Sequence, residues 1–313
     1  MAERSPLISV ITAVYNGESY IRETIESVLK FAADVDFEYI VVNDGSTDST
    51  LGILRDFKDS ISIVDQENVG ESASVSRAFE LSKGAYLLVV SADDPLLTSE
   101  LFTEVFDWFE EKPDLVAVYP DWQMIDPVGN VIQTVKVPSF SDELLIGHCR
   151  TLPGPGVIIR RSPAVDIGGR NSKWVFVGDY DFWLRLSRCG EIRHRAKVLA
   201  QWRHHPESTS VSKRGIQMAR ERIDVIENFL LFNDVKPELA RQALGHAYYT
   251  AARLTYFSRE VPGKQFLKTA FVKRKGWVEE AEISVILFIL LDPFSRLLLK
   301  PLKFLRIFRI RNL

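Results

Sequence analysis

Two adjacent carboxylates, Asp93 and Asp94, follow the apolar run of residues 86–90 after Ser91 and Ala92. This run is short, rich in β-branched and aliphatic residues, and predicts a strand buried on both faces of a parallel sheet. Open α/β sheets bind their ligands at the carboxyl ends of such strands. Carboxylate oxygens there could hold Mg²⁺ or Mn²⁺ and, through the ion, a diphosphate. The alternative is an Asp-Asp-Pro turn that caps the next helix.

The elements that would position these carboxylates alternate between strand and helix patterns. Strands are expected at residues 7–14, 37–42 and 61–64, and helices at residues 18–31, 51–57 and 69–82. This order predicts a parallel sheet with right-handed crossovers, in which the loops 12–17 and 43–48 converge on the carboxylates. Neither a G-x-G-x-x-G motif after the first strand nor a P-loop lysine motif occurs.

The second of these loops contains a further carboxylate, Asp44, directly before Gly45. An Asp-Gly pair suits a turn that needs a positive φ angle, and the serine and threonine after it could cap the next helix. The carboxylate could instead accept the N–H of a pyrimidine ring, which would give selectivity for the base. Both interpretations stay open on the residues alone.

The second half of the sequence adds three polar sites. Residues 153–156, Pro-Gly-Pro-Gly, form either a loop that lets a ligand approach the backbone or a tight connection. Asp179 falls in the first turn of a predicted helix, where a carboxylate commonly satisfies free N–H groups. Arg203, His204 and His205 follow a strand expected at residues 198–202, and the two adjacent histidines do not predict zinc without further ligands at suitable spacing. A solvated surface pair is the alternative for Arg203 and His205.

The other elements expected in this half are short strands, one hairpin and two short helices. Strands are predicted at residues 115–119 and 157–160, and a hairpin pairs residues 121–125 with residues 131–135. A helix is expected near residues 142–148. The glycines at 168 and 169 should close another short helix and face an acceptor.

Composition and charge restrict the class of protein. The 313 residues suggest one large domain with an appendage, and the net charge of −3 gives no support for nucleic acid as a partner. Cys149 and Cys189 offer neither a disulfide framework nor metal spacing, so a reducing cytoplasm is expected. The apolar start lacks a basic segment and predicts a first strand, not a signal peptide.

The C-terminal third changes character after residue 212. Amphipathic helices are expected at residues 215–232, 237–259 and 262–271, which form a helical appendage over residues 213–280. Residues 283–313 contain six basic residues and one acid, so this segment carries +5 and the rest of the chain −8. Its longest apolar run falls short of the about 20 residues that span a bilayer. A basic, apolar tail over residues 281–313 fits an anionic membrane surface, or else a buried helix.

Three segments together resemble the N-terminal half of family-2 glycosyltransferases of the GT-A fold: ITAVYNGESYIRETIESVL, YIVVNDGSTDST and NVGESASVSRAFELSKGAYLLVVSADD. The resemblance covers residues 6–212 and implies an α/β fold with a mostly parallel sheet flanked by helices. It further implies a UDP- or dTDP-linked sugar donor, Mn²⁺ or Mg²⁺ as cofactor, and inversion at the anomeric carbon.

The resemblance also implies roles for individual residues. The metal ligands are Asp93 and Asp94, and the general base is Asp179. The residues that would contact the nucleotide-sugar are Thr12, Val14, Tyr15, Asp44, Asn68, Gly70, Arg77, Ser91, Ala92, Asp93, Arg203 and His205. The residues expected on the acceptor side are Gly154, Gly156, Gly169 and Asp181.

Two positions depart from the family pattern. The carboxylate motif of the family commonly begins with an acid, and here Ser91 stands in that place. The Glu-Asp pair that carries the base is here Gly178-Asp179.

The expected function is transfer of a sugar to the hydroxyl of a saccharide or lipid-linked saccharide in cell-surface polysaccharide assembly, with the protein peripheral on the inner face of the cell membrane. A polyprenyl-phosphate sugar synthase and a non-catalytic nucleotide-sugar-binding scaffold are the alternatives.

Overall fold

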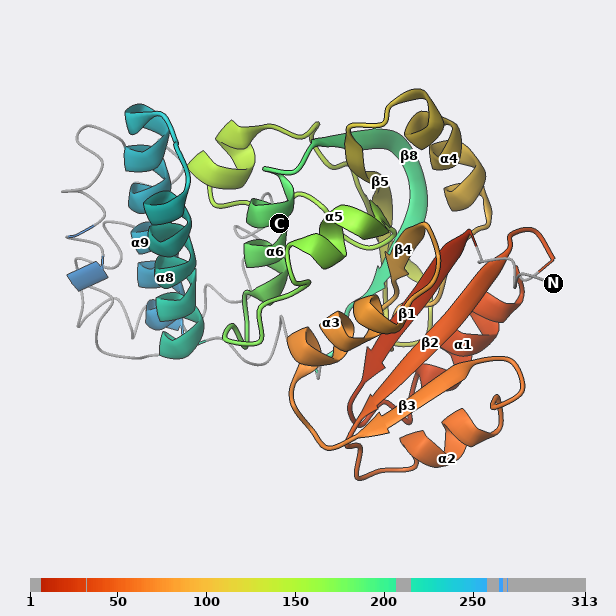
Figure 1. Ribbon diagram of the computed structural model, residues 1–313. Coiled ribbons are helices and arrows are strands. Elements are labelled where there is room, and N and C mark those ends of the chain that lie inside the picture. Colours follow the sequence, from red (N-terminus) through yellow and green to blue (C-terminus); the bar gives the residue numbers. More distant parts are fainter. Residues whose placement is uncertain (1–6, 32, 207–214, 258–264, 267–268, 270–313) are drawn as a thin grey trace. The chain divides into compact units, whose positions relative to one another are not determined.

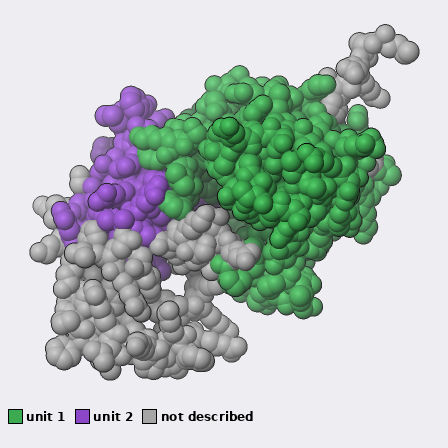
Figure 2. Space-filling view, turned by 90° about the horizontal axis from the view of Figure 1, so that it is seen from below, with its two compact units in different colours: residues 1–140, 152–208 green, residues 141–151, 209–313 purple. Residues whose placement is uncertain are grey.

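A computed structural model describes residues 7–31, 33–206, 215–257, 265–266 and 269. The chain divides into two compact units, residues 1–140 with 152–208 and residues 141–151 with 209–313 (Figure 2). The predicted boundary after residue 212 falls within residues 207–214, outside the described part. The grouping of residues 141–151 with the helical unit has no counterpart in the sequence-based expectation.

An eight-stranded mixed sheet forms the centre of the first unit (Figure 1). Its parallel half contains β1 (Ile8–Val14), β2 (Phe37–Asp44), β3 (Ser62–Gln66) and β4 (Tyr86–Val89), in the spatial order β3-β2-β1-β4. The register aligns β1 with both neighbours, so that Ile11 lies beside Ile40 and Val89. The carboxyl ends of these strands therefore share one edge, as the alternation of strands and helices predicts.

Helices cover both faces of this parallel half. The apolar sides of α1 (Ile21–Leu29), α2 (Thr50–Arg55) and α4 (Glu100–Glu111) pack in one core with alternate residues of β1, β2 and β4. The helix α3 (Glu71–Leu81) connects β3 to β4 and packs on β1 and β2. The connections from β1 to β2 and from β2 to β3 run in one direction along the sheet, and the connection from β3 to β4 runs in the other. Because all three crossovers are right-handed, α3 lies on the opposite face from α1 and α2. The predicted α/β class is confirmed.

The other half of the sheet is mainly antiparallel. It contains β5 (Leu115–Ile125), β6 (Val131–Val135), β7 (Ile158–Arg160) and β8 (Glu191–Arg203). The predicted hairpin is confirmed, since β5 and β6 pair with Trp122 opposite Val135. The expected break at Pro120 is wrong: β5 continues through it, and the parallel pairing of β5 with β8 shifts register at Pro120/Asp121 instead. At such a bulge one residue is left out of the hydrogen-bond ladder, so a proline, which has no N–H to donate, does not end the strand.

Two short helices lie between the antiparallel strands of this unit. The helix α5 (Arg161–Asp166) ends before the glycine pair, and α6 (Gly178–Leu186) begins next to the candidate base. Both elements are where the sequence predicts them.

The second unit is helical. It contains α8 (Ile216–Phe232) and α9 (Pro237–Phe257), and the segment Glu143–Gly147 forms a π-helix rather than the expected α-helix. Small buried residues on α9, Ala243 and Ala247, allow close helix packing. In the described part of the chain no helix is long and apolar enough to cross a membrane. The predicted helix at 262–271 lies almost wholly, and the basic tail at 281–313 entirely, outside the described residues.

Candidate active site

The two adjacent carboxylates lie in a turn just beyond the end of β4. The side chain of Asp93 is 27% exposed, whereas Asp94 is only 5% exposed. The Asp94 amide donates to the carbonyl of Ser91 at 3.1 Å, which closes the turn. Burial, followed by the charge of Asp93, raises the pKa of Asp94 to about 8. A cation bound by both carboxylates would offset the burial and the repulsion that disfavour ionisation of Asp94.

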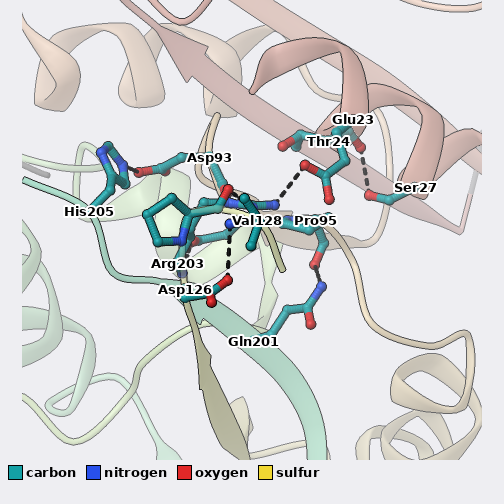
Figure 3. Close-up of polar contacts among 12 residues, drawn as sticks. Glu23, Thr24, Ser27, Asp93, Pro95, Asp126, Val128, Gln201, Arg203 and His205 are labelled. Atoms are coloured by element: carbon teal, nitrogen blue, oxygen red, sulfur yellow. Dashed lines mark hydrogen bonds and ion pairs between the residues drawn. The ribbon is translucent and has the colours of Figure 1, made fainter. Parts of the chain in front are cut away.

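The end of β8 brings Arg203 and His205 to the same turn (Figure 3). The backbone N–H of Arg203 donates to the Asp94 carboxylate at 2.7 Å, and its Nε donates to the Asp93 carbonyl at 2.8 Å. His205 Nε2 lies 2.8 Å from the second carboxylate oxygen of Asp93. The structure thus gathers four residues that are predicted to serve the donor and its metal.

Within the described residues no group of three or more His, Cys, Asp or Glu side chains forms a metal site by itself. The donor set nonetheless fits Mg²⁺ or Mn²⁺. Both metals prefer oxygen ligands, and Mg²⁺ is often held by one or two carboxylates together with substrate phosphates. Asp93 and Asp94 would hold the ion, which would neutralise the charge on a departing diphosphate.

The loop after β2 contains Asp44, which is 3% exposed and already engaged. Its carboxylate accepts the backbone N–H groups of Val69 and Gly70, each at 2.9 Å, and the side-chain amide of Gln66 at 3.0 Å. Ionised carboxylates offer about four lone-pair sites, so one acceptor position is left for a ligand. Asp44 therefore fixes the loop that leads into α3.

The predicted base-pocket residues of the first loop differ in exposure. Thr12 is fully buried, and its hydroxyl lies 2.8 Å from the Val90 carbonyl and 2.9 Å from the Tyr39 hydroxyl. Val14 is buried, whereas the ring of Tyr15 is 53% exposed. Thr12 can therefore contribute to the predicted base pocket only from beneath its surface, whereas Tyr15 presents an exposed ring just after the carboxyl end of β1.

The predicted donor residues Asn68, Gly70 and Arg77 lie on or before α3. Gly70 precedes the helix with a φ of +91°, a conformation that favours glycine. Arg77 Nη1 donates to Gln66 Oε1 at 2.7 Å. A shallow groove of about 670 Å³ lies between this helix and the loop 168–172, and Arg77 and Arg170 are among its lining residues.

The Pro-Gly-Pro-Gly loop of residues 153–156 approaches the carboxylate turn. Gly156 and Asp94 both line a small cavity of about 30 Å³, which also contacts Ser91 and Gln201. Gly156 has a φ of +76°, and a Cβ atom there would lie 2.6 Å from the Cβ of Ala200. Only glycine fits this close approach to β8, which places the loop beside the predicted metal ligands.

The two acids of α6 have different surroundings. Asp179 is half-buried, and its Oδ1 accepts the N–H of Tyr180 at 2.7 Å, so the second oxygen is left for a ligand. Asp181 is 5% exposed and paired with Arg185, whose Nε lies 2.8 Å from its carboxylate. Arg185 also donates to the carbonyls of Ile167 and Gly169. This bonding makes Asp181 an anchor of the glycine loop and leaves Asp179 better placed as a base.

A tight seam joins α3 to the loop and helix that carry these acids. A Cβ at Gly178 would lie 2.2 Å from Ser72 Oγ, and one at Gly169 would lie 2.7 Å from Ser76 Oγ. Ser76 Oγ also donates to the carbonyl of Arg170 at 2.8 Å. The departure from the Glu-Asp pattern at Gly178 thus has a packing reason, because a side chain there requires Ser72 to rotate or α6 to move away from α3.

Sequence reasoning missed two side chains that hold the site together. Glu23 on α1 accepts from Arg203 Nη2 at 2.7 Å, and Gln66 joins Asp44 to Arg77. Both residues resemble ordinary surface positions in the sequence, and Glu23 lies 180 residues from its partner. No local pattern could have found them.

A mostly parallel sheet flanked by helices, with a carboxylate turn beyond its central strand, defines the GT-A type of nucleotide-sugar-dependent fold. Residues 9–142 match the family model described as glycosyl transferase family 2. This segment is therefore a family-2 glycosyltransferase domain.

Sequence relatives support this assignment. An uncharacterised glycosyltransferase of Rickettsia felis is 25% identical over 90% of this chain, and a hyaluronan synthase of Pasteurella multocida is 30% identical over 68% of it. A chondroitin synthase of Escherichia coli is 30% identical over 69% of this chain. The chain spans 48%, 22% and 31% of the lengths of these three relatives, which is less than half of each.

Solved structures show the same fold. The crystal structure of S. aureus TarS residues 1–349 in complex with UDP aligns with a TM-score of 0.63 at 20% identity, covering 86% of this chain and 81% of that one. The mannosyltransferase PcManGT of Pyrobaculum calidifontis, in complex with GDP-Man and Mn²⁺, aligns with a TM-score of 0.56 at 15% identity, covering 97% and 86%. At these identities the likeness concerns the fold alone.

Proposed function

We propose that this chain transfers a sugar from a UDP- or dTDP-linked donor to a hydroxyl of a saccharide or lipid-linked saccharide, with inversion at the anomeric carbon. The observation that carries the proposal is the turn at Asp93 and Asp94, with His205 bonded to the first carboxylate and Arg203 to the second. Mg²⁺ or Mn²⁺ held there would stabilise the diphosphate as the glycosidic bond breaks. The similarity to hyaluronan and chondroitin synthases supports a role in polysaccharide assembly.

Asp179 would act as the general base. A sugar hydroxyl is a poor nucleophile until its proton is accepted, and a positioned carboxylate serves this purpose. The engagement of Asp181 with Arg185 supports this choice between the two acids of α6. Of the glycines expected on the acceptor side, Gly154 is exposed and could be approached, whereas Gly156 and Gly169 are buried and would shape this side only through their packing against Ala200 and Ser76. A peripheral position at the inner face of the membrane rests on the basic composition of residues 281–313.

Release of nucleotide by the purified chain tests the proposal. UDP-, dTDP- and GDP-linked sugars are incubated with Mn²⁺, with and without EDTA, and with an oligosaccharide primer to supply acceptor hydroxyls. We expect release from a UDP- or dTDP-sugar that EDTA abolishes. The variant Asp94→Asn should be inactive, whereas Asp107→Asn, an exposed carboxylate on α4, should match the unmodified chain. Release unaffected by EDTA, or equal in both variants, would overturn the proposed metal site.

A further inference from the structure

Arg203 is buried to 99%, which is unusual for an arginine, and it is the largest of the fully buried side chains in the described chain. Each of its three guanidinium nitrogens donates to a different segment: Nε to the Asp93 carbonyl, Nη1 to the Pro127 carbonyl and Nη2 to Glu23. These bonds measure 2.7–2.8 Å (Figure 3). A side chain so enclosed and so fully engaged has little freedom to contact a ligand.

The helix α1 presents one face to this arginine and to the carboxylate turn. The guanidinium lies over the ring of Tyr20 at 4.8 Å, and Glu23 pairs with it. Thr24 Oγ1 donates to the Ala92 carbonyl at 2.9 Å, and Ser27 Oγ accepts the Leu96 N–H at 2.7 Å. Tyr20 stands at the N-cap of α1, and Glu23, Thr24 and Ser27 follow at i+3, i+4 and i+7, so the four side chains lie along one side of the helix.

We infer that Arg203 is a positioning residue, which fixes the Asp93–Asp94 turn against α1 through Glu23 and does not contact the diphosphate of the donor. This inference rests on the proposed function and assigns Glu23 a part in it. The arginine holds the turn from two sides, by its side chain on the Asp93 carbonyl and by its backbone N–H on the Asp94 carboxylate. Orientation of the two carboxylates toward a metal therefore depends on the Arg203–Glu23 pair.

If Arg203 positions the carboxylates, the effect of its substitution on UDP binding differs from the effect expected if it contacts the diphosphate. If Arg203 positions the metal ligands, Arg203→Lys lowers the gain in UDP affinity that Mn²⁺ gives by roughly 10- to 100-fold, the usual effect of losing an outer-shell partner. UDP binding without Mn²⁺ then stays unchanged. If Arg203 contacts the phosphates, the same variant weakens UDP binding equally with and without Mn²⁺.

The variant Glu23→Ala separates the two roles further. In the positioning role it lowers the Mn²⁺-dependent gain in the same direction as Arg203→Lys. In the contact role it frees the arginine, and UDP binds as well as before or more tightly. Glu26→Ala is the matched control, because Glu26 is an exposed acid of the same helix. Titration calorimetry with UDP, with and without Mn²⁺, gives both affinities for each variant and for the unmodified chain.

Thermal unfolding gives a readout that needs no ligand. Because Arg203 and Glu23 bond directly, the loss of Tm in the double variant Arg203→Lys/Glu23→Ala should be smaller than the sum of the two single losses. Strictly additive losses would overturn the positioning role. If the unmodified chain shows no Mn²⁺-dependent binding of UDP, dTDP or GDP, the proposed function fails, while the Tm comparison still decides whether the pair acts as one unit.

Discussion

The close approach of Gly178 to Ser72 allows a prediction about the start of α6. In Gly178→Ala the new Cβ would lie 2.2 Å from Ser72 Oγ and 3.3 Å from its Cβ, where ordinary contact begins at 3.4 Å. The helix start must move away from α3 by about 1 Å, or the serine must rotate. Overpacking of this kind costs about 1–3 kcal/mol of unfolding free energy. A shift of about 1 Å in Asp179, the next residue, should reduce kcat by up to ~10²-fold.

Urea unfolding and steady-state kinetics of sugar transfer measure the two effects. Gly52→Ala on α2 is the control, because nothing lies within 4 Å of a Cβ there. That substitution should stabilise the chain by about 0.5–1 kcal/mol and leave kcat unchanged. The double variant Gly178→Ala/Ser72→Ala removes the 2.2 Å contact and should recover most of both losses. Unchanged stability and kcat in Gly178→Ala, or failure of the second substitution to restore them, would refute this account of the seam.

Three further predictions concern other parts of the chain. Asp179→Asn should keep donor binding by calorimetry and lose transfer by ~10²–10⁴-fold; transfer within a factor of a few would fit a lipid-phosphate acceptor instead. Thr12→Val leaves the hydroxyl of Tyr39 without its partner and should cost about 1–3 kcal/mol in urea unfolding, an effect that an isolated base contact would not produce. Deletion of residues 293–313 should move the protein from the pellet to the supernatant with anionic liposomes, and unchanged partitioning would contradict a membrane role for the tail.

Much of the fold could be predicted because its patterns are local. The apolar runs of β1, β2 and β4 and the amphipathic faces of α1, α8 and α9 each lie within one stretch of sequence, and the structure confirms them. The prediction ended a strand at Pro120, because proline cannot donate a hydrogen bond to the sheet and is normally found inside a strand only at an edge or a bulge. The register shift at Pro120/Asp121 cannot be read from the sequence. Nothing in the composition of residues 141–151 indicates that they group with the helical unit.

The candidate site shows the same division between local and distant information. Asp93 and Asp94 stand out because a strand pattern and two acids are adjacent in sequence. The partners that hold them, Glu23 and Arg203, come from elements at opposite ends of the first unit's sequence, and an ion pair between such distant residues leaves no periodic trace. The family resemblance assigned Arg203 to the donor, whereas the burial of its guanidinium is a property of the folded chain that the sequence does not show.

The unusual residue at the start of the carboxylate motif fits the electrostatics of the turn. Burial and Asp93 already raise the pKa of Asp94 to about 8, and a hydrogen bond from Ser91 works in the opposite direction. A third acid at position 91 would add repulsion where the serine hydroxyl relieves it. The hydrogen bond from Ser91 therefore offsets part of this rise and favours the ionised form of Asp94, which is the form that accepts a cation. Both departures from the family pattern, Ser91 and Gly178, are thus compatible with an intact site rather than signs of its loss.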